Sequence, residues 1–347
     1  MFDHTHYVPV LRWKQAEQHA LRDLFPWVKS KLTPLIEVPE WGSSTSQSSL
    51  LKYPASILKM WGTAPFFFAF GPFSTSISEN ILEGFFDESK SRGLYIIPST
   101  SITDNAALHD AIGSRREKDE IEVCIRLFRE DLIRPDLSPA LETLMSHLRA
   151  NEAATHLVVD LKIHQHSDSL IAPLLSQIPN ITKWRTLTVV SGAFRKNLTG
   201  LSVGRHEFPR SEWTAWFTAV KNHQLPRNPT FGDYAVLHPY LSEPKPDMNV
   251  SASIRYTSFD YWVVMKGEGL RNKSGAGFAQ YPANADLLTM QPEFCGAWFS
   301  PGDRYISEIA LKQKPTGNPK TWLQAGISHH LAFTTDQMTK MFVSSRG

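Results

Sequence analysis

The sequence of 347 residues has few cysteines, no long apolar run and no excess of one charge. Two cysteines, Cys124 and Cys295, exclude a disulfide-rich framework and a zinc ribbon. The longest apolar run, residues 64–70 (APFFFAF), is far shorter than the roughly 20 residues that span a bilayer. Lys and Arg total 36 against 34 Asp and Glu, so bulk charge gives no support for nucleic-acid binding.

What the sequence does have is enough apolar material for a large core. Hydrophobic residues make up 41% of the chain, which excludes a wholly disordered protein. The first residues, MFDHTHYVPV, lack the basic and apolar regions of a secretory signal, so we expect a cytoplasmic protein with reduced thiols and no membrane association. The length suggests two domains, or one barrel with additions.

Short apolar runs alternate with amphipathic segments over the first three quarters of the chain. Most are nearly continuous, as in strands covered on both faces of a parallel sheet. The runs are residues 7–13, 35–38, 66–70, 94–98, 121–127, 156–161, 187–191 and 234–237, followed by the pair 252–256 and 261–266. This alternation predicts an α/β fold with a (β/α)₈ TIM-barrel-like domain, with an open doubly wound sheet as the alternative.

The tail differs in composition, being rich in Gly, Pro and aromatic residues. Residues 266–277 (KGEGLRNKSGAG) have the character of a long loop. We therefore expect a barrel-like domain over residues 1–265 and a loop-rich α+β extension over residues 266–347 that packs on the barrel.

Several of the expected strands end on polar residues, which in a barrel gather at the C-terminal face. The polar residues at or near these ends are Lys14, Glu37, Arg126, Asp160, Lys162, Asp233, His238, Arg255, Tyr256 and Lys266. One interpretation places Lys14, Arg255 and Lys266 around an anionic group, with Glu37 and Asp160 as general bases or metal ligands. The other interpretation is a set of buried ion pairs that plugs the barrel.

Two histidine motifs are further candidates. His164 and His166, followed by Asp168, form a His-x-His motif that chelates a metal when it lies on a strand, although a solvated loop fits its position better. His329 and His330 are adjacent, so one would act as a general acid or base while the other packs in the core. Asp303 lies in a Pro-Gly-Asp sequence that suits catalysis or a routine turn.

Seven segments together resemble the "beta protein" family, named after a phage T4 protein. They are YVPVLRWKQAEQHAL, LTPLIEVPE, FGDYAVLHP, SIRYT, YWVVMKGEG, FSPGDRYI and GNPKTWLQAGISHHLAF, which extend from residue 7 to residue 333. The resemblance implies a phage- or bacterium-derived cytosolic protein of mobile elements and phage-defence neighbourhoods, with no agreed reaction. The positions it singles out are Lys14, Glu17, Glu37, Arg255, Tyr256, Gly302, Asp303, Trp322, His329 and His330.

Two functions follow as hypotheses. The first is a barrel enzyme or binder that acts on a phosphate-containing ligand, a nucleotide or nucleic acid, with a divalent metal as a conceivable cofactor. Its catalytic candidates are Lys14, Glu37, Asp160, Asp303 and His329, and its ligand-binding candidates are Lys162, Arg255, Tyr256, Lys266 and His330. The second is a non-catalytic sensor or interaction subunit of an anti-phage defence or toxin–antitoxin system. Its partner would be a phage protein, a host protein or a subunit from the same operon.

Overall fold

A computed structural model describes residues 2–39, 46–164, 171–222, 225–240, 248–273 and 275–343. The chain forms two compact units, each built from separated segments. The first unit comprises Met1–Trp13, Leu32–Ser191 and Glu212–Asp233, and the second comprises Lys14–Lys31, Gly192–Ser211 and Tyr234–Gly347. This division differs from the boundary expected between residues 265 and 266, because Lys14–Lys31, Gly192–Ser211 and residues 234–265 belong to the second unit.

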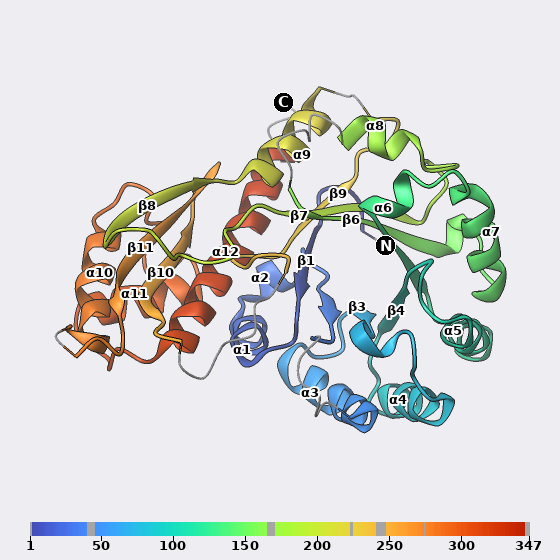
Figure 1. Ribbon diagram of the computed structural model, residues 1–347, viewed down its shortest axis with the longest axis horizontal. Helices are drawn as coiled ribbons and strands as arrows, with labels where there is room; N and C mark the ends of the chain where they lie inside the picture. Colours follow the sequence, from blue (N-terminus) through green and yellow to red (C-terminus); the bar gives the residue numbers. More distant parts are fainter. Residues whose placement is uncertain are drawn as a thin grey trace. The chain divides into compact units, whose positions relative to one another are not determined.

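The first unit is a closed barrel of eight parallel strands (Figure 1). In order around the barrel they are β1 (Tyr7–Leu11), β2 (Leu35–Glu37), β3 (Phe66–Ala69), β4 (Ile96–Thr100), β5 (Val123–Phe128), β6 (Thr155–Ile163), β7 (Thr186–Gly192) and β9 (Thr230–Asp233). β9 pairs with both β7 and β1 and so closes the ring. The prediction of a (β/α)₈ barrel is therefore confirmed, and the open-sheet alternative is wrong.

The eighth strand lies four residues earlier than the sequence predicts. Residues 230–233 (TFGD) form the strand, whereas the apolar residues 234–237 (YAVL) form a turn. Leu237 donates a backbone hydrogen bond to Tyr234 in this turn, and Ala235 has a positive φ of 51°. Strand pairing with β1 thus overrides local β-propensity, which is weak in a strand that contains glycine and aspartate.

Helices follow most of the barrel strands. They are α3 (Tyr53–Met60), α4 (Glu79–Ser91), α5 (Ala106–Asp119), α6 (Arg129–Leu132), α7 (Leu137–His147), α8 (Ile171–Ser176) and α9 (Ser211–Lys221), with 3₁₀ turns at Gln47–Lys52, Gly71–Phe73 and Glu152–Ala154. Each α-helix of two or more turns buries an apolar stripe. In α4, for example, Phe85 and Phe86 are buried against Phe68 and Phe70.

The second unit has a three-stranded antiparallel sheet in the order β10-β11-β8. The strands are β8 (Gly204–Pro209), β10 (Ser251–Thr257) and β11 (Tyr261–Gly269). Its helices are α1 (Gln15–Asp23), α2 (Pro26–Lys29), α10 (Gln280–Thr289), α11 (Pro301–Ala310) and α12 (Pro319–Val343), with a 3₁₀ turn at Gly277–Ala279. The two strands predicted at residues 252–256 and 261–266 are confirmed, and they pair antiparallel. β8, whose exposure alternates along GRHEFP, was not predicted.

A buried cluster of the second unit includes Ile254, Tyr256, Val263, Ile306 and Trp322. It joins the sheet to α10, α11 and α12. In the part of the chain that is described, no helix is both long and apolar enough to cross a membrane.

Candidate functional site

The direction in which each strand's side chains point follows from aromatic contacts and strand register. The ring of Phe68 lies 4.7 Å from that of Phe85 on α4, so Phe68 faces the helix layer. Its neighbour Ala69 therefore faces the barrel interior, since successive strand residues alternate between faces. Glu37, the last residue of β2, is in register with Ala69 and thus also points inward.

The same argument orients β5 and β6. Phe67 faces inward, and its ring lies 5.2 Å from the His156 ring at the start of β6. Asp160 and Lys162 lie four and six residues after His156, so they point inward at the C-terminal end of β6. The register between β5 and β6 places Arg126 on this face as well.

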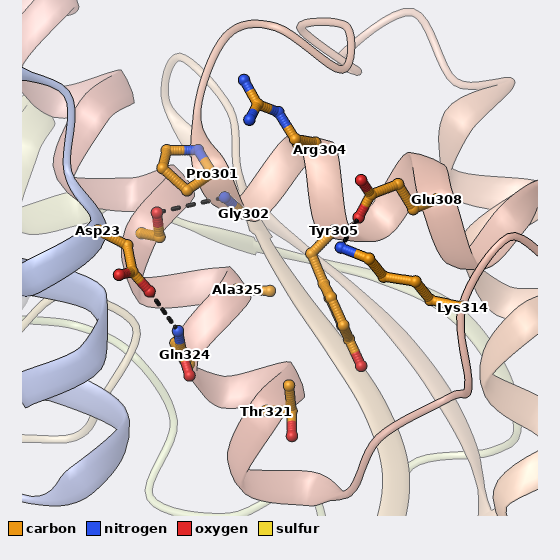
Figure 2. Close-up of a pocket in the computed structure, with 11 residues that line it drawn as sticks. Asp23, Pro301, Gly302, Arg304, Tyr305, Glu308, Lys314, Thr321, Gln324 and Ala325 are labelled. Atoms are coloured by element: carbon orange, nitrogen blue, oxygen red, sulfur yellow. Dashed lines mark hydrogen bonds and ion pairs between the residues drawn. The ribbon is translucent and has the colours of Figure 1, made fainter.

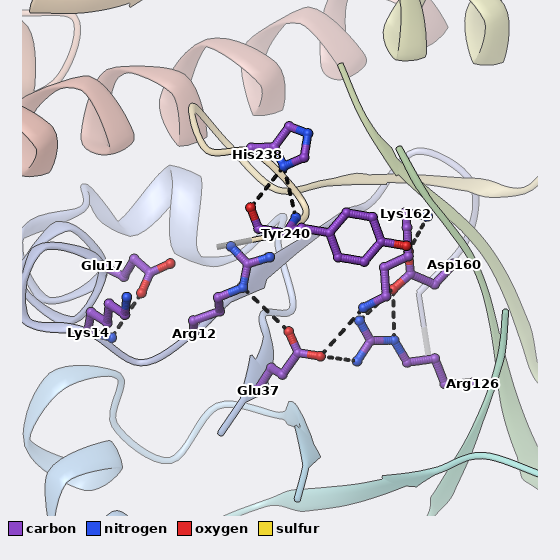
Figure 3. Close-up of polar contacts among 9 residues, drawn as sticks. All are labelled: Arg12, Lys14, Glu17, Glu37, Arg126, Asp160, Lys162, His238 and Tyr240. Carbon is purple, nitrogen blue, oxygen red and sulfur yellow. Dashed lines mark hydrogen bonds and ion pairs between the residues drawn. The ribbon is translucent and has the colours of Figure 1, made fainter. Parts of the chain in front are cut away.

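We define the barrel-mouth cluster as Arg12, Glu37, Arg126, Asp160 and Lys162, which come from the ends of β1, β2, β5 and β6 (Figure 3). All five belong to the first unit. Three cations and two carboxylates give the cluster a formal charge of +1. The sequence brought Glu37, Asp160 and Lys162 forward as candidates for one site, and the structure places them together.

Arg126 is the centre of this cluster. Its Nη1 donates to Glu37 Oε1 over 2.9 Å, and its Nε and Nη2 donate to Asp160 Oδ2 over 3.0 and 2.5 Å. The Arg126 side chain is 4% exposed and that of Asp160 is 0% exposed. A buried carboxylate of this kind is stable only when its charge is paired, and Arg126 and Lys162 supply that pairing.

Lys162 is the more accessible cation, with a side chain that is 21% exposed. Its Nζ lies 3.8 Å from Glu37 Oε1 and 3.5 Å from Asp160 Oδ2. Its backbone N–H donates to Asp160 Oδ1 over 2.9 Å, which ties the strand end to the carboxylate. The ring of Phe128 lies 5.0 Å from this Nζ and 5.2 Å from the Arg126 guanidinium, in cation–π range of both.

Glu37 is ionised and reachable. Burial raises the pKa of Glu37, but the charges of Arg126, Lys162 and Arg12 outweigh that effect and hold the pKa below its usual range. Its side chain is 16% exposed. Glu37 is therefore a permanent hydrogen-bond acceptor at neutral pH and is unsuited to act as a general acid there.

Backbone strain is concentrated at the same strand ends. Trp13 and Lys162 have positive φ angles of 52° and 55°, although neither is glycine. Trp13 follows Arg12 directly, and Lys162 is itself in the cluster. The other non-glycine residues with positive φ in the described ranges follow β9 or lie in turns after helices: Ala235, Glu120, Arg149, Asn180 and Lys312. Strain at strand ends beside a charged cluster is typical of functional sites.

Asp303, His329 and Tyr256 meet in the second unit and not in the barrel. Tyr256 OH donates to Asp303 Oδ1 over 2.7 Å, and His329 Nδ1 lies 2.9 Å from Asp303 Oδ2. The other ring nitrogen of His329 contacts the Thr257 carbonyl oxygen at 2.9 Å. Asp303 and His329 are completely buried, and the Tyr256 ring stacks on His329. The arrangement has the properties of a hydrogen-bonded core network.

The remaining candidates also lie in the second unit. His330 Nδ1 contacts Thr257 Oγ1 at 2.9 Å in the core. Arg255 donates to the Val236 carbonyl over 2.7 Å, and burial lowers the pKa of Arg255 to about 10. Lys266 is half-buried on β11 and pairs in register with Ser253.

Lys14 and Glu17 form the start of helix α1. The Lys14 backbone N–H donates to Glu17 Oε2 over 2.9 Å, an N-terminal capping contact (Figure 3). Lys14, Arg255 and Lys266 thus belong to the second unit, while Glu37 and Asp160 belong to the first. The single anion site expected from these five residues is present in neither unit alone.

The second unit has a small pocket of about 190 Å³ beside α11 and α12 (Figure 2). Its acidic residues are already engaged. Asp23 accepts a hydrogen bond from Gln324 over 3.1 Å, and Glu308 pairs with Lys314 at 2.6 Å. Gly302 and Ala325, where the two helices approach each other closely, also line this pocket.

The described residues offer no group of three or more His, Cys, Asp or Glu side chains that could hold a metal ion. Of the His-x-His motif, only His164 is described, and His166 and Asp168 lie outside the described residues.

Sequence reasoning did not select Arg12 and did not give Arg126 a role in the site. The available signal was a charged residue at the end of an apolar strand, YVPVL-R for Arg12 and VCI-R for Arg126. Such a residue in a parallel barrel points either into the helix layer or into the interior, and only the register decides between the two.

The family model named Beta protein matches residues 7–336, nearly the whole chain. No curated protein matches the sequence. Among solved structures, the catalytic domain of a hyperthermophilic chitinase from Pyrococcus furiosus is similar at a TM-score of 0.42 and 12% identity, over 70% of this chain and 92% of that one. The YdjI aldolase from Escherichia coli K12 is similar at a TM-score of 0.41 and 9% identity, over 96% of this chain and 90% of that one. These values are too low to transfer any function, and the barrel assignment rests on the chain's own strand pairing.

Proposed function

The chain belongs to the Beta protein family, and we propose that its barrel mouth binds a phosphate-containing ligand such as a nucleotide. The observation that carries the proposal is the convergence of three cations and two carboxylates at the C-terminal ends of four barrel strands. In barrels of this type, ligands are bound and transformed at that face.

The charge balance favours an anionic ligand. With Arg12, Arg126 and Lys162 against Glu37 and Asp160, the cluster has an excess of one positive charge. The contacts of Lys162 Nζ with Asp160 and Glu37, at 3.5 and 3.8 Å, are longer than the strong charge-assisted hydrogen bond that a phosphate oxygen would form with this ammonium group. A phosphate bound to Lys162 would leave the Arg126–Asp160 pair in place, so Asp160 would stay neutralised.

The strained strand ends support the same location. A left-handed backbone costs a non-glycine residue on the order of 1 kcal/mol and persists where the surroundings enforce it. At Lys162 the enforcing contact is the hydrogen bond from its own N–H to Asp160 Oδ1. This contact directs the lysine side chain toward the cluster, as a binding site requires.

A second candidate function is a non-catalytic sensor or interaction subunit. It is favoured by the hydrogen bonds of Arg126 to Glu37 and Asp160, which are contacts that a purely structural ion-pair network would also make. It is favoured also by Trp298, which is 79% exposed in the second unit and suits a protein partner. The association with phage or defence genes, implied by the family resemblance, is compatible with both functions.

A thermal-shift screen of the full chain tests the proposal. Inorganic phosphate, nucleotides, short oligonucleotides and divalent metals are each added in excess. A ligand at about 100 times its dissociation constant stabilises a protein by about 2.7 kcal/mol, which is readily measured. We expect a shift with a phosphate-containing ligand that is lost in Lys162→Met and kept in Lys118→Met, a matched change on the exposed surface of α5. No shift with any of these probes would favour the interaction subunit.

A further inference from the structure

Glu37 is the one acidic residue of the barrel-mouth cluster with an open acceptor atom. Its Oε1 accepts from Arg126, whereas its Oε2 has Arg12 Nε as its nearest cationic partner at 3.7 Å, too far for a hydrogen bond. Within the described ranges Oε2 accepts no hydrogen bond. A carboxylate oxygen has two acceptor sites, so Oε2 retains its full capacity for donors from a ligand.

An open carboxylate beside phosphate-binding cations constrains the ligand. A phosphate oxygen next to Glu37 would be repelled, because both groups are anionic. A hydroxyl group would instead donate to Oε2 and form a charge-assisted hydrogen bond. The favoured ligand thus presents its phosphate to Lys162 and a hydroxyl group to Glu37.

We infer that the barrel mouth selects hydroxylated phosphate esters, such as sugar phosphates or the ribose phosphate of a nucleotide, through a hydrogen bond from a ligand hydroxyl to Glu37 Oε2. This inference rests on the proposed function and adds the ligand class to it. Glu37 is a specificity-determining residue in this scheme, and Lys162 supplies affinity for the phosphate. A phosphate ester without a hydroxyl group, such as methyl phosphate, lacks this hydrogen bond and binds through Lys162 alone.

The test compares two small esters by isothermal titration calorimetry on the full chain. Methyl phosphate carries no hydroxyl group, and glycerol phosphate carries two. A hydrogen bond to a charged acceptor is worth about 1.5 kcal/mol or more, so we expect glycerol phosphate to bind the wild-type protein about tenfold more tightly than methyl phosphate. The ratio of the two affinities is the readout, because it cancels changes in the overall charge of the site.

Two variants locate the preference at Glu37. Glu37→Gln removes the negative charge and keeps the shape, and Glu37→Asp keeps the charge but retracts the carboxylate by about one bond length of 1.5 Å. We expect the affinity ratio to fall below about threefold in both. Glu122→Gln, which precedes β5 at the other end of the barrel, is the matched control and should keep the wild-type ratio. If Glu37→Gln does not fold, the comparison of the affinity ratio between Glu37→Asp and the wild-type protein still tests the inference.

The outcomes separate the inference from the proposed function. Equal binding of the two esters by the wild-type protein, or a preference that both Glu37 variants retain, would overturn the inference and leave phosphate binding intact. Failure of both esters and of inorganic phosphate to bind would overturn the proposed function, and the inference with it.

Discussion

Arg126 Nη1 donates to Glu37 Oε1 across 2.9 Å and joins two residues that are 89 positions apart in the chain. The contact spans the barrel interior between β5 and β2, which are separated by two other strands in the ring. Arg126 also neutralises the buried carboxylate of Asp160. One guanidinium thus fixes the position of both carboxylates of the barrel-mouth cluster. We therefore expect its removal to lower the free energy of unfolding.

We predict that Arg126→Met destabilises the protein by about 3–5 kcal/mol, because it leaves Asp160 buried with its main partner missing. Urea unfolding followed by circular dichroism measures the change. The double variant Arg126→Met with Asp160→Asn should recover part of the loss, since the unpaired charge is gone. Arg134→Met, which breaks an exposed pair with Asp136, is the control and should cost less than about 1 kcal/mol. A loss at Arg126 no larger than at Arg134 would contradict the central role of Arg126.

His6, which precedes β1 at the end of the barrel opposite the barrel-mouth cluster, should make the free energy of unfolding depend on pH. Burial lowers the pKa of His6 from 6.5 to about 4 in the folded protein. Between these values the unfolded chain binds a proton that the folded chain does not, so stability falls as pH falls from 7 to 4. The contribution is about 2–3 kcal/mol over this window. His6→Gln should flatten the dependence relative to wild type, in urea unfolding at pH 7, 5.5 and 4. Parallel curves for the two proteins would show that His6 is not the cause.

The crossing of α11 and α12 depends on a glycine. A Cβ added at Gly302 would lie 2.1 Å from the carbonyl oxygen of Ala325, and the helices would have to separate. We predict that Gly302→Ala costs about 1–3 kcal/mol or more. Gly84→Ala in α4 is the matched helical control, where the nearest atom is a flexible Leu51 methyl group at 3.1 Å. Because alanine has the higher helix propensity, that change should be neutral or stabilising by up to about 1 kcal/mol. Thermal unfolding measures the change in stability of each variant. Equal changes in Gly302→Ala and Gly84→Ala would refute the close approach of α11 and α12 at Gly302.

The buried network of the second unit should matter for stability and not for ligand binding. Tyr256→Phe removes a donor to Asp303 and an acceptor for the Cys295 backbone N–H. Leaving these groups without a partner should cost about 1–3 kcal/mol in chemical unfolding. The affinity for phosphate esters, measured by calorimetry below the unfolding transition, should stay at the wild-type value. A folded Tyr256→Phe protein that no longer binds would return Tyr256, Asp303 and His329 to the list of candidate site residues.

The barrel could be predicted from the sequence because strands covered on both faces leave a strong signal. Runs such as FFFAF and HLVVDL are apolar on both sides, and amphipathic helices separate them. Glu37, Asp160 and Lys162 were selected for a related reason: polar residues at the ends of parallel strands share one face of a barrel.

The position of the eighth strand and the surroundings of the candidate site residues could not be predicted, because they depend on contacts between residues far apart in the sequence. The strand at residues 230–233 is defined by its pairing with β1 and β7, while the more apolar residues 234–237 form a turn. Asp303 and His329 resemble catalytic residues in sequence, yet the packing of α11 against α12 places both in a solvent-free network. Arg126 became central only once its register placed it between Glu37 and Asp160.

The most direct test of phosphate binding at the barrel mouth is calorimetric titration of glycerol phosphate into the wild-type protein, Lys162→Met and Lys118→Met. The account predicts that wild type and Lys118→Met bind equally, and that Lys162→Met binds at least about tenfold more weakly, as expected for loss of a charge-assisted hydrogen bond to phosphate. Equal binding by all three proteins would contradict it, and would place the phosphate away from the barrel-mouth cluster.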